Sequence, residues 1–69
     1  MIEVFKTNVQ DQSEAIELSG LLQRYFPGNR IDFDLEDCDK VLRIEGASFT
    51  PGKVMQLIHE RGYTCHVMD

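Results

Sequence analysis

A chain of 69 residues can build one hydrophobic core but not two, so the sequence predicts a single domain over residues 1–69. Seven basic residues stand against twelve acidic ones, and the resulting charge of −5 argues against nucleic acid and anionic membrane surfaces as partners. The apolar runs are far shorter than the ~20 residues that span a bilayer, so no membrane insertion is expected. Two cysteines, too few for a secreted disulfide framework, and the lack of a leader-like start favour the cytoplasm.

The segment 2–9 is rich in β-branched and aromatic residues and ends in a polar cluster, which is typical of a strand followed by a loop. Its alternation is ambiguous. Ile2 and Val4 point to one side and Phe5 to the other, but the same alternation would place Lys6 with Ile2 and Val4. The sequence therefore leaves open which face of this strand is buried.

Residues 11–26 predict a helix, because apolar side chains recur at intervals of three and four. Asp11 or Ser13 is expected to cap its first turn, and Pro27-Gly28 to end it. Gly20 weakens the helix and is expected to mark a close packing contact. The expected apolar face contains Ala15, Leu18, Leu22 and Tyr25, widened by Ile16, Leu21 and Phe26.

Two short segments next predict a β-hairpin. In residues 31–35 isoleucine, phenylalanine and leucine alternate with Asp32 and Asp34, which indicates a half-buried strand with an acidic solvent face. Residues 41–45 alternate in the same way, and the polar stretch 36–40 connects the two.

The chain then predicts a second helix and a last strand. Thr50 supplies an N-cap and Pro51 a first-position proline, and Gly62 ends the helix. Its apolar positions are Val54, Leu57 and Ile58. Residues 63–67 alternate once more as a strand.

The order strand, helix, strand, strand, helix, strand predicts an α+β fold, a ferredoxin-like βαββαβ sandwich. Both helices should cover one face of a four-stranded antiparallel sheet with the strand order 4-1-3-2. In this arrangement three loops meet at one end of the molecule. They gather the side chains of Asp11, Glu14, Asp37, Cys38, Asp39 and Tyr63.

Nearly the whole chain resembles a heavy-metal-associated (HMA) domain, the βαββαβ module of copper chaperones and metal-transporting ATPases. KTNV matches the end of the family's first strand, DKVLRIEG its third strand, and Gly62-Tyr63 the start of its last strand. The resemblance implies a metallochaperone-like ancestry. In the family the loop after the first strand carries two cysteines separated by two residues, which bind soft cations. Here Asp11 and Glu14 stand in those two positions, so hard carboxylate oxygens replace thiolates.

Asp11 and Glu14 are the candidate metal ligands, with Asp37 or Asp39 expected to assist. The competing interpretation is that both carboxylates only stabilise the start of the helix. Cys65 and His66 are not expected to ligate one metal ion together. Cys65 and His66 point to opposite faces of a strand, with Cys65 in the core and His66 in solvent.

Other sulfur and imidazole groups are expected to have structural roles. His59 is interpreted as a residue at the boundary of the core. Cys38 lies in an acidic turn that disfavours its thiolate, so it is not expected to be a nucleophile. The two cysteines lie on opposite edges of the predicted sheet and cannot form an internal disulfide.

The densest charge in the chain predicts where a partner would bind. A basic protein is one candidate, and a second copy that pairs through an edge strand is another. The predicted acidic face consists of Asp32, Asp34, Glu36, Asp37 and Asp39.

These features lead to one functional hypothesis and three alternatives. The leading hypothesis is a non-catalytic HMA-like domain that has lost its soft-metal site and binds an unknown partner, without a cofactor. The first alternative is retained metal binding or transport, through Asp11 and Glu14 or through cysteines shared across a dimer. An enzyme of the acylphosphatase kind would need an arginine and glycines in the loop after the first strand, which are missing. A dimeric small-molecule sensor is the third alternative.

Overall fold

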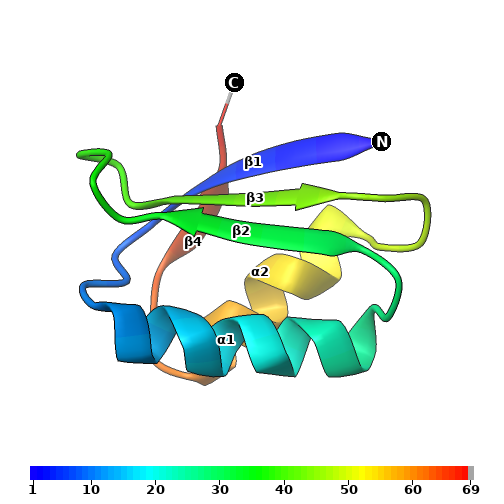
Figure 1. Cartoon of the computed structure of the whole chain (residues 1–69), viewed down its shortest axis with the longest axis horizontal. Coiled ribbons are helices and arrows are strands. Elements are labelled where there is room, and N and C mark those ends of the chain that lie inside the picture. The colour runs from blue at the N-terminus through cyan, green and yellow to red at the C-terminus, as the bar shows by residue number, and fades with distance from the viewer. Residues whose placement is uncertain (69) are drawn as a thin grey trace.

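The computed structural model describes residues 1–68 and shows an α+β fold (Figure 1). The elements follow the predicted order along the chain. They are β1 (Ile2–Thr7), α1 (Gln12–Tyr25), β2 (Arg30–Asp34), β3 (Val41–Glu45), α2 (Pro51–Glu60) and β4 (Cys65–Val67). No helix in this part of the chain has the length and apolar character that crossing a membrane requires.

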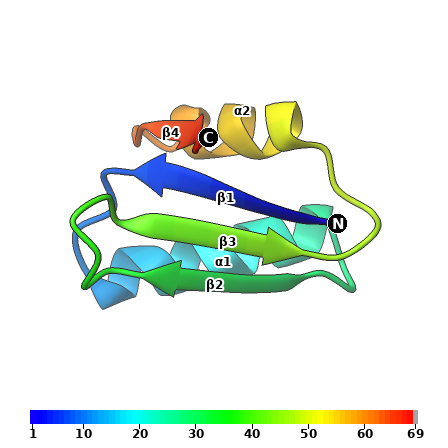
Figure 2. The same ribbon diagram turned by 90° about the horizontal axis from the view of Figure 1, so that it is seen from above.

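The four strands form one antiparallel sheet with the order β2-β3-β1-β4 (Figure 2). The expected order 4-1-3-2 names the same neighbours from the opposite edge, because a strand order can be read in either direction. The central strands are β1 and β3, and β2 and β4 are the edges. Each edge strand therefore has one side without a neighbouring strand.

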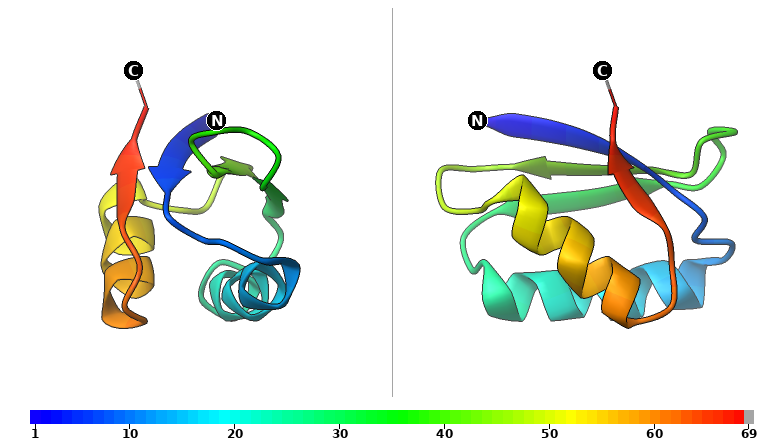
Figure 3. Two further views of the ribbon diagram at one scale, coloured as in Figure 1. Left: turned by 90° about the vertical axis from the view of Figure 1, so that its left-hand side faces the viewer. Right: turned by 180° about the vertical axis from the view of Figure 1, so that it is seen from behind.

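Both helices lie against the same face of the sheet, and the other face is open (Figure 3, left). The buried side chains form one cluster between the helices and the sheet. Its largest fully buried members are Phe5, Leu18, Leu22, Leu42, Ile44 and Ile58. Burying these side chains is the main driving force for folding in a domain this small.

The structure settles which face of β1 is buried. Phe5 is 0 % and Thr7 is 5 % exposed, whereas Ile2 is 53 % exposed. Phe5 lies opposite Leu42 of β3 in the ladder, so two large side chains meet on the helix-covered face. The buried hydroxyl of Thr7 donates a hydrogen bond to the carbonyl of Lys40 at 2.6 Å. This bond compensates for the loss of hydration when the polar side chain at the end of β1 is buried.

The buried face of α1 is narrower than the sequence predicts. Ala15, Leu18, Leu21 and Leu22 are buried, but Tyr25 is 54 % exposed and Ile16 is 63 % exposed. The prediction was wrong for these two residues because a helix above a small sheet buries only one stripe of side chains. Tyr25 lies under the ammonium group of Lys53 instead, with Nζ 5.6 Å from the ring centroid.

Gly20 makes no close packing contact either. A Cβ atom at this position would have no neighbour within 4 Å among atoms outside its own helical turn and adjacent residues. The expectation of a tight contact at Gly20 was therefore wrong. Glycine at this position lowers the stability of the helix, and no packing contact requires it.

The helix ends follow the predicted residues with one exception. Asp11 caps α1, as expected, and its side chain accepts a hydrogen bond from the backbone N–H of Glu14 at 2.9 Å. Thr50 occupies the N-cap position of α2, but its side chain makes no capping hydrogen bond. The N–H of Lys53, a normal partner of a capping side chain, donates instead to the backbone carbonyl of Thr50 at 3.1 Å.

The end of α2 is a Schellman turn. Gly62 has a φ of 92°, and its N–H donates to the carbonyl of His59 at 2.9 Å. The N–H of Tyr63 donates to the carbonyl of Ile58 at 3.3 Å. These two hydrogen bonds define the motif and fix the direction in which the chain enters β4.

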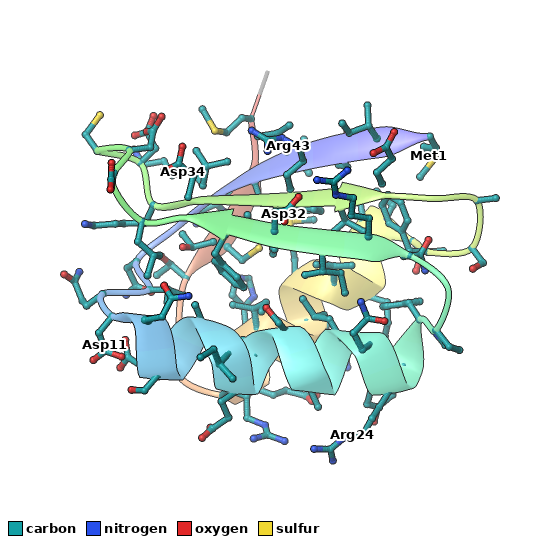
Figure 4. All side chains as sticks on the ribbon, viewed as in Figure 1. Met1, Asp11, Arg24, Asp32, Asp34 and Arg43 are labelled. Carbon is teal, nitrogen blue, oxygen red and sulfur yellow. The ribbon has the colours of Figure 1, made fainter. Side chains whose placement is uncertain are left out.

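The acidic hairpin strand is built as predicted. Ile31, Phe33 and Leu35 pack against the core cluster. Asp32 and Asp34 lie on the opposite side, with Arg43 of β3, and point away from the helices (Figure 4). The open face of the sheet is therefore charged along β2.

Candidate functional site

Three loops meet at one end of the molecule, as the topology predicts (Figure 1). The N–H of Thr7 donates to the carbonyl of Asp39 at 3.1 Å, which joins the end of β1 to the β2–β3 turn. The side chain of Asn8 accepts a hydrogen bond from the N–H of Thr64 at 2.8 Å, which joins the same segment to the loop before β4. This end of the molecule is the first place to look for a site.

Asp11 lies at this end, at the start of α1 (Figure 4). Besides the N–H of Glu14, its Oδ1 accepts a hydrogen bond from the hydroxyl of Ser13 at 2.7 Å. These bonds, with that from the Glu14 N–H first, lower the pKa of Asp11 below its usual value. A carboxylate with these two bonds is a helix cap in its normal geometry.

Glu14 also has partners within the protein. Its Oε1 accepts a hydrogen bond from the N–H of Gln10 at 3.0 Å. The nearby Glu14 carboxylate raises the pKa of Tyr63. The predicted ligand pair thus works as a reciprocal cap at the helix start, similar to a capping box. Asp37 and Asp39 form a separate group with Cys38, which includes neither Asp11 nor Glu14.

That separate group lies in the β2–β3 turn. One donor atom from each of Asp37, Cys38 and Asp39 falls within 4.8 Å of the others. The turn brings them together because the N–H of Asp39 donates to Oδ1 of Asp37 at 2.8 Å and the N–H of Lys40 to the carbonyl of Asp37 at 3.0 Å. Lys40 takes a φ of 48° to close the turn.

The sequence predicted that these three residues lie at one end of the molecule with Asp11 and Glu14, but not that they form a donor cluster by themselves. The available signal was the order acid, cysteine, acid in a short polar connection. A strand would send neighbouring side chains to opposite faces, but a turn does not alternate. A thiolate with two carboxylates offers a donor set that suits a borderline ion such as Zn²⁺.

The acidic edge, defined here as Asp32, Asp34, Glu36, Asp37 and Asp39, carries more charge than its basic neighbours balance. Nε of Arg30 lies 3.3 Å from Oδ2 of Asp32, and Nζ of Lys6 lies 3.6 Å from Oδ1 of Asp39. Within residues 1–68 the carboxylates of Asp34, Glu36 and Asp37 form no ion pair. This part of the surface is therefore strongly negative.

A shallow groove of about 280 Å³ runs beside the acidic edge, between α1 and β2. Ala15 and Ile16 of α1 line one side, and Ile31 and Phe33 of β2 line the other. Asp32 also lines the groove. This groove was not predicted, because Ile16 was assigned to the core and is instead exposed beside it.

Cys65 is a core residue, as predicted. Its side chain is fully buried, and burial raises the pKa of its thiol to about 12. His66 faces solvent, also as predicted, and His59 is exposed rather than at the core boundary. The two imidazole rings lie 5.9 Å apart between centroids. Sequence reasoning did not pair them, because the contact depends on the turn between α2 and β4.

Comparison of this chain with models of protein families, with curated proteins and with solved structures finds no match in any of the three. The resemblance to HMA domains rests on the sequence landmarks alone.

Proposed function

We propose that the chain is a non-catalytic, HMA-like interaction module that binds a basic partner through its acidic edge. The observation that carries this proposal is the set of carboxylates on β2 and its following turn that lack a counter-ion. Asp34, Glu36 and Asp37 have no basic neighbour within ion-pair distance among the described residues. A surface of one sign attracts partners of the opposite sign and speeds their association.

The ferredoxin-like architecture and the HMA ancestry belong to this proposal. They are supported by the element order, by two helices on one face of an antiparallel sheet, and by the landmarks KTNV and DKVLRIEG. The loss of the soft-metal site is supported by Asp11 and Glu14, whose carboxylates are engaged in capping. We place the domain in the cytoplasm, consistent with two free cysteines.

The position of β2 favours a basic partner over a second copy. As an edge strand it offers unpaired backbone groups to an incoming extended segment. If two copies paired through β2, Asp32 and Asp34 of one would face the same residues of the other, and like charges across a ladder are destabilising. A segment with lysine or arginine at alternate positions would pair favourably.

The test uses a peptide of alternating lysine and valine as the probe, with the isotope-labelled protein followed by NMR. We expect the largest shift changes in the amides of residues 30–39 and a strong loss of binding at high salt. The variant Asp32→Asn/Asp34→Asn should weaken binding. The matched control Glu17→Gln/Glu60→Gln removes the same charge from the helices and should bind as the parent does.

Two results would refute this proposal: equal weakening in the two double variants, or shift changes that spread over the whole surface. Sedimentation of the protein alone tests the competing homodimer. A dimer that dissociates in Asp32→Asn/Asp34→Asn would show that β2 pairs with itself.

Metal handling is the second candidate, favoured by the donor atoms of Asp37, Cys38 and Asp39 within 4.8 Å of one another. Cys65 cannot take part while the domain is folded, because it is fully buried with a raised thiol pKa. A dimer that shares cysteines would therefore use Cys38. Zinc titration followed by isotope-labelled NMR of the turn should show binding that Cys38→Ser abolishes, and unchanged spectra in the parent would exclude this candidate.

We propose no catalytic activity. The loop between β1 and α1 contains neither arginine nor glycine. The carboxylates of Asp11 and Glu14 form hydrogen bonds that cap the start of α1. This loop is where an acylphosphatase-like enzyme would hold its phosphate group.

A further inference from the structure

Two exposed histidines lie side by side at the β4 edge of the sheet. The acidic edge lies on the opposite side of the sheet, along β2. His59 belongs to the last turn of α2, and His66 is the middle residue of β4. Their ring centroids are 5.9 Å apart and their planes are inclined by 58°. Figure 3 (right) shows α2 and β4 next to one another, joined by a short turn.

The backbone holds this pair in place. The Schellman turn of Gly62 fixes how the chain leaves α2 and enters β4. The residue before His59 is Ile58 and the residue before His66 is Cys65, and both are fully buried in the core. Each imidazole is therefore attached to an anchored position, and only its own side-chain torsions remain to be adjusted.

The separation of the rings is close to that of two histidines bound to one ion. With metal to nitrogen distances of 2.0–2.1 Å, two imidazoles at the tetrahedral angle have centroids about 5 Å apart, so the observed 5.9 Å needs only a small change in side-chain torsions. Imidazole nitrogen is a preferred ligand of Zn²⁺, Ni²⁺ and Cu²⁺. A metal titration distinguishes such a site from a simple contact of two tilted rings.

The charges around the pair permit a cation. Lys6 lies opposite His66 in the β1–β4 ladder, but its ammonium group is 3.6 Å from Asp39 and is partly neutralised by it. The Glu60 carboxylate, next to His59, accepts a hydrogen bond from the side chain of Gln56 at 3.2 Å. The chain as a whole carries a charge of −5, which favours cations near its surface.

We propose that His59 and His66 form a two-imidazole binding site for a borderline divalent cation of the Zn²⁺ and Ni²⁺ class, with water in the remaining coordination positions. This site is independent of the acidic edge and of the Asp37, Cys38 and Asp39 group. It uses neither of the positions at which HMA domains carry their cysteines.

The experiment uses the full chain with the substitution Cys38→Ser, which removes the only exposed thiol among the described residues. Ni²⁺ is the probe, because a paramagnetic ion broadens the resonances of the groups that bind it. We expect the imidazole signals of His59 and His66 to broaden together, at one ion per chain, and Zn²⁺ to displace the nickel. His59→Ala and His66→Ala should each weaken binding by about tenfold or more, since the second ligation is intramolecular in the parent.

Three outcomes would overturn the proposal. In the first, each single variant binds Ni²⁺ as tightly as the parent. In the second, the two histidines broaden independently at different nickel concentrations. In the third, the ion broadens the signals of the Asp37–Asp39 turn or of Met1 instead. Because both histidines are exposed, the variants should keep the amide spectrum and thermal midpoint of the parent, which verifies that loss of binding is not loss of fold.

Discussion

Asn29 is a buried polar residue that connects two loops at the end of the molecule opposite the β2–β3 turn. It is 4 % exposed, and its Nδ2 donates to the carbonyls of Phe26 at 2.8 Å and Ser48 at 3.3 Å. Its Oδ1 is buried without a hydrogen-bond partner in the described part of the chain. That oxygen lies against Gly46, where a Cβ atom would stand 1.9 Å from it. Only a residue without a side chain fits at position 46.

The substitution Gly46→Ala should therefore destabilise the domain by about 1–3 kcal/mol, the usual cost of forcing an extra carbon into a packed site. The control is Gly52→Ala in α2, where a Cβ atom would have no neighbour within 4 Å, so this variant should be at least as stable as the parent. Urea unfolding of both variants measures the difference. Equal stabilities would show that Asn29 moves aside freely.

The cap at Asp11 predicts a pH effect. Hydrogen bonds lower its folded pKa below the ordinary value of 3.8, so ionised Asp11 favours the folded state. This contribution is present above the ordinary value and is lost as the pH falls through the lower folded pKa. The variant Asp11→Asn keeps a capping oxygen but cannot titrate. We expect the thermal midpoint of the parent to exceed that of the variant at neutral pH and to approach it in acid. A difference that stays constant with pH would contradict this assignment.

The two residues differ in how far sequence predicts their roles. Asp11 was one of two predicted caps, with Ser13, because a capping partner lies only a few residues along the chain, and in the structure that partner is the N–H of Glu14. Asn29 contacts Gly46 and Ser48, which lie nearly twenty residues further along the chain. No local pattern encodes such a contact, so it becomes visible only in the folded chain.

At the scale of elements, α1 shows where periodicity misleads. Spacing alone cannot tell how much of a helix a small sheet will cover, so Tyr25 and Ile16 were assigned to the core, and both are exposed. Strand β2 was simpler, because every second residue is apolar and a half-covered strand has only two sides. For β1 the alternation was ambiguous until the pairing of Phe5 with Leu42 fixed its face.

Gly20 offers a direct test of the account of α1. Alanine at this helix position meets no neighbouring atom and improves helix propensity, so Gly20→Ala should stabilise the domain by about 1 kcal/mol. Chemical denaturation of the parent and the variant measures the gain. If the variant is instead less stable than the parent, Gly20 makes the close packing contact that the sequence predicted.

For the molecule as a whole, the order of elements and the antiparallel sheet were predictable, since each element carries its own local pattern and short connections limit the topologies. The candidate sites were not. The groove beside β2 and the histidine pair depend on how separate segments pack against each other, and the Asp37–Asp39 cluster depends on the conformation of a single turn.

The two cysteines report on the integrity of the whole fold. Cys38 is exposed, whereas Cys65 is fully buried and its thiol pKa is raised to about 12. A thiol reagent at neutral pH should therefore label one site per native chain and both sites in denaturant, because thiolate is the reactive form. Mass spectrometry of labelled peptides identifies the sites. Rapid native labelling of Cys65 would mean that β4 detaches from the sheet without global unfolding.

The central place of β1 bears on how the protein is made. This strand is synthesised before its ladder partners, which begin only at Val41 in β3 and Cys65 in β4. Until those residues have been synthesised, an apolar strand with two unpaired edges stays exposed to other chains. The sheet therefore closes late, and a nascent chain halted before Cys65 would present the β4-binding side of β1 as an open template for misassembly.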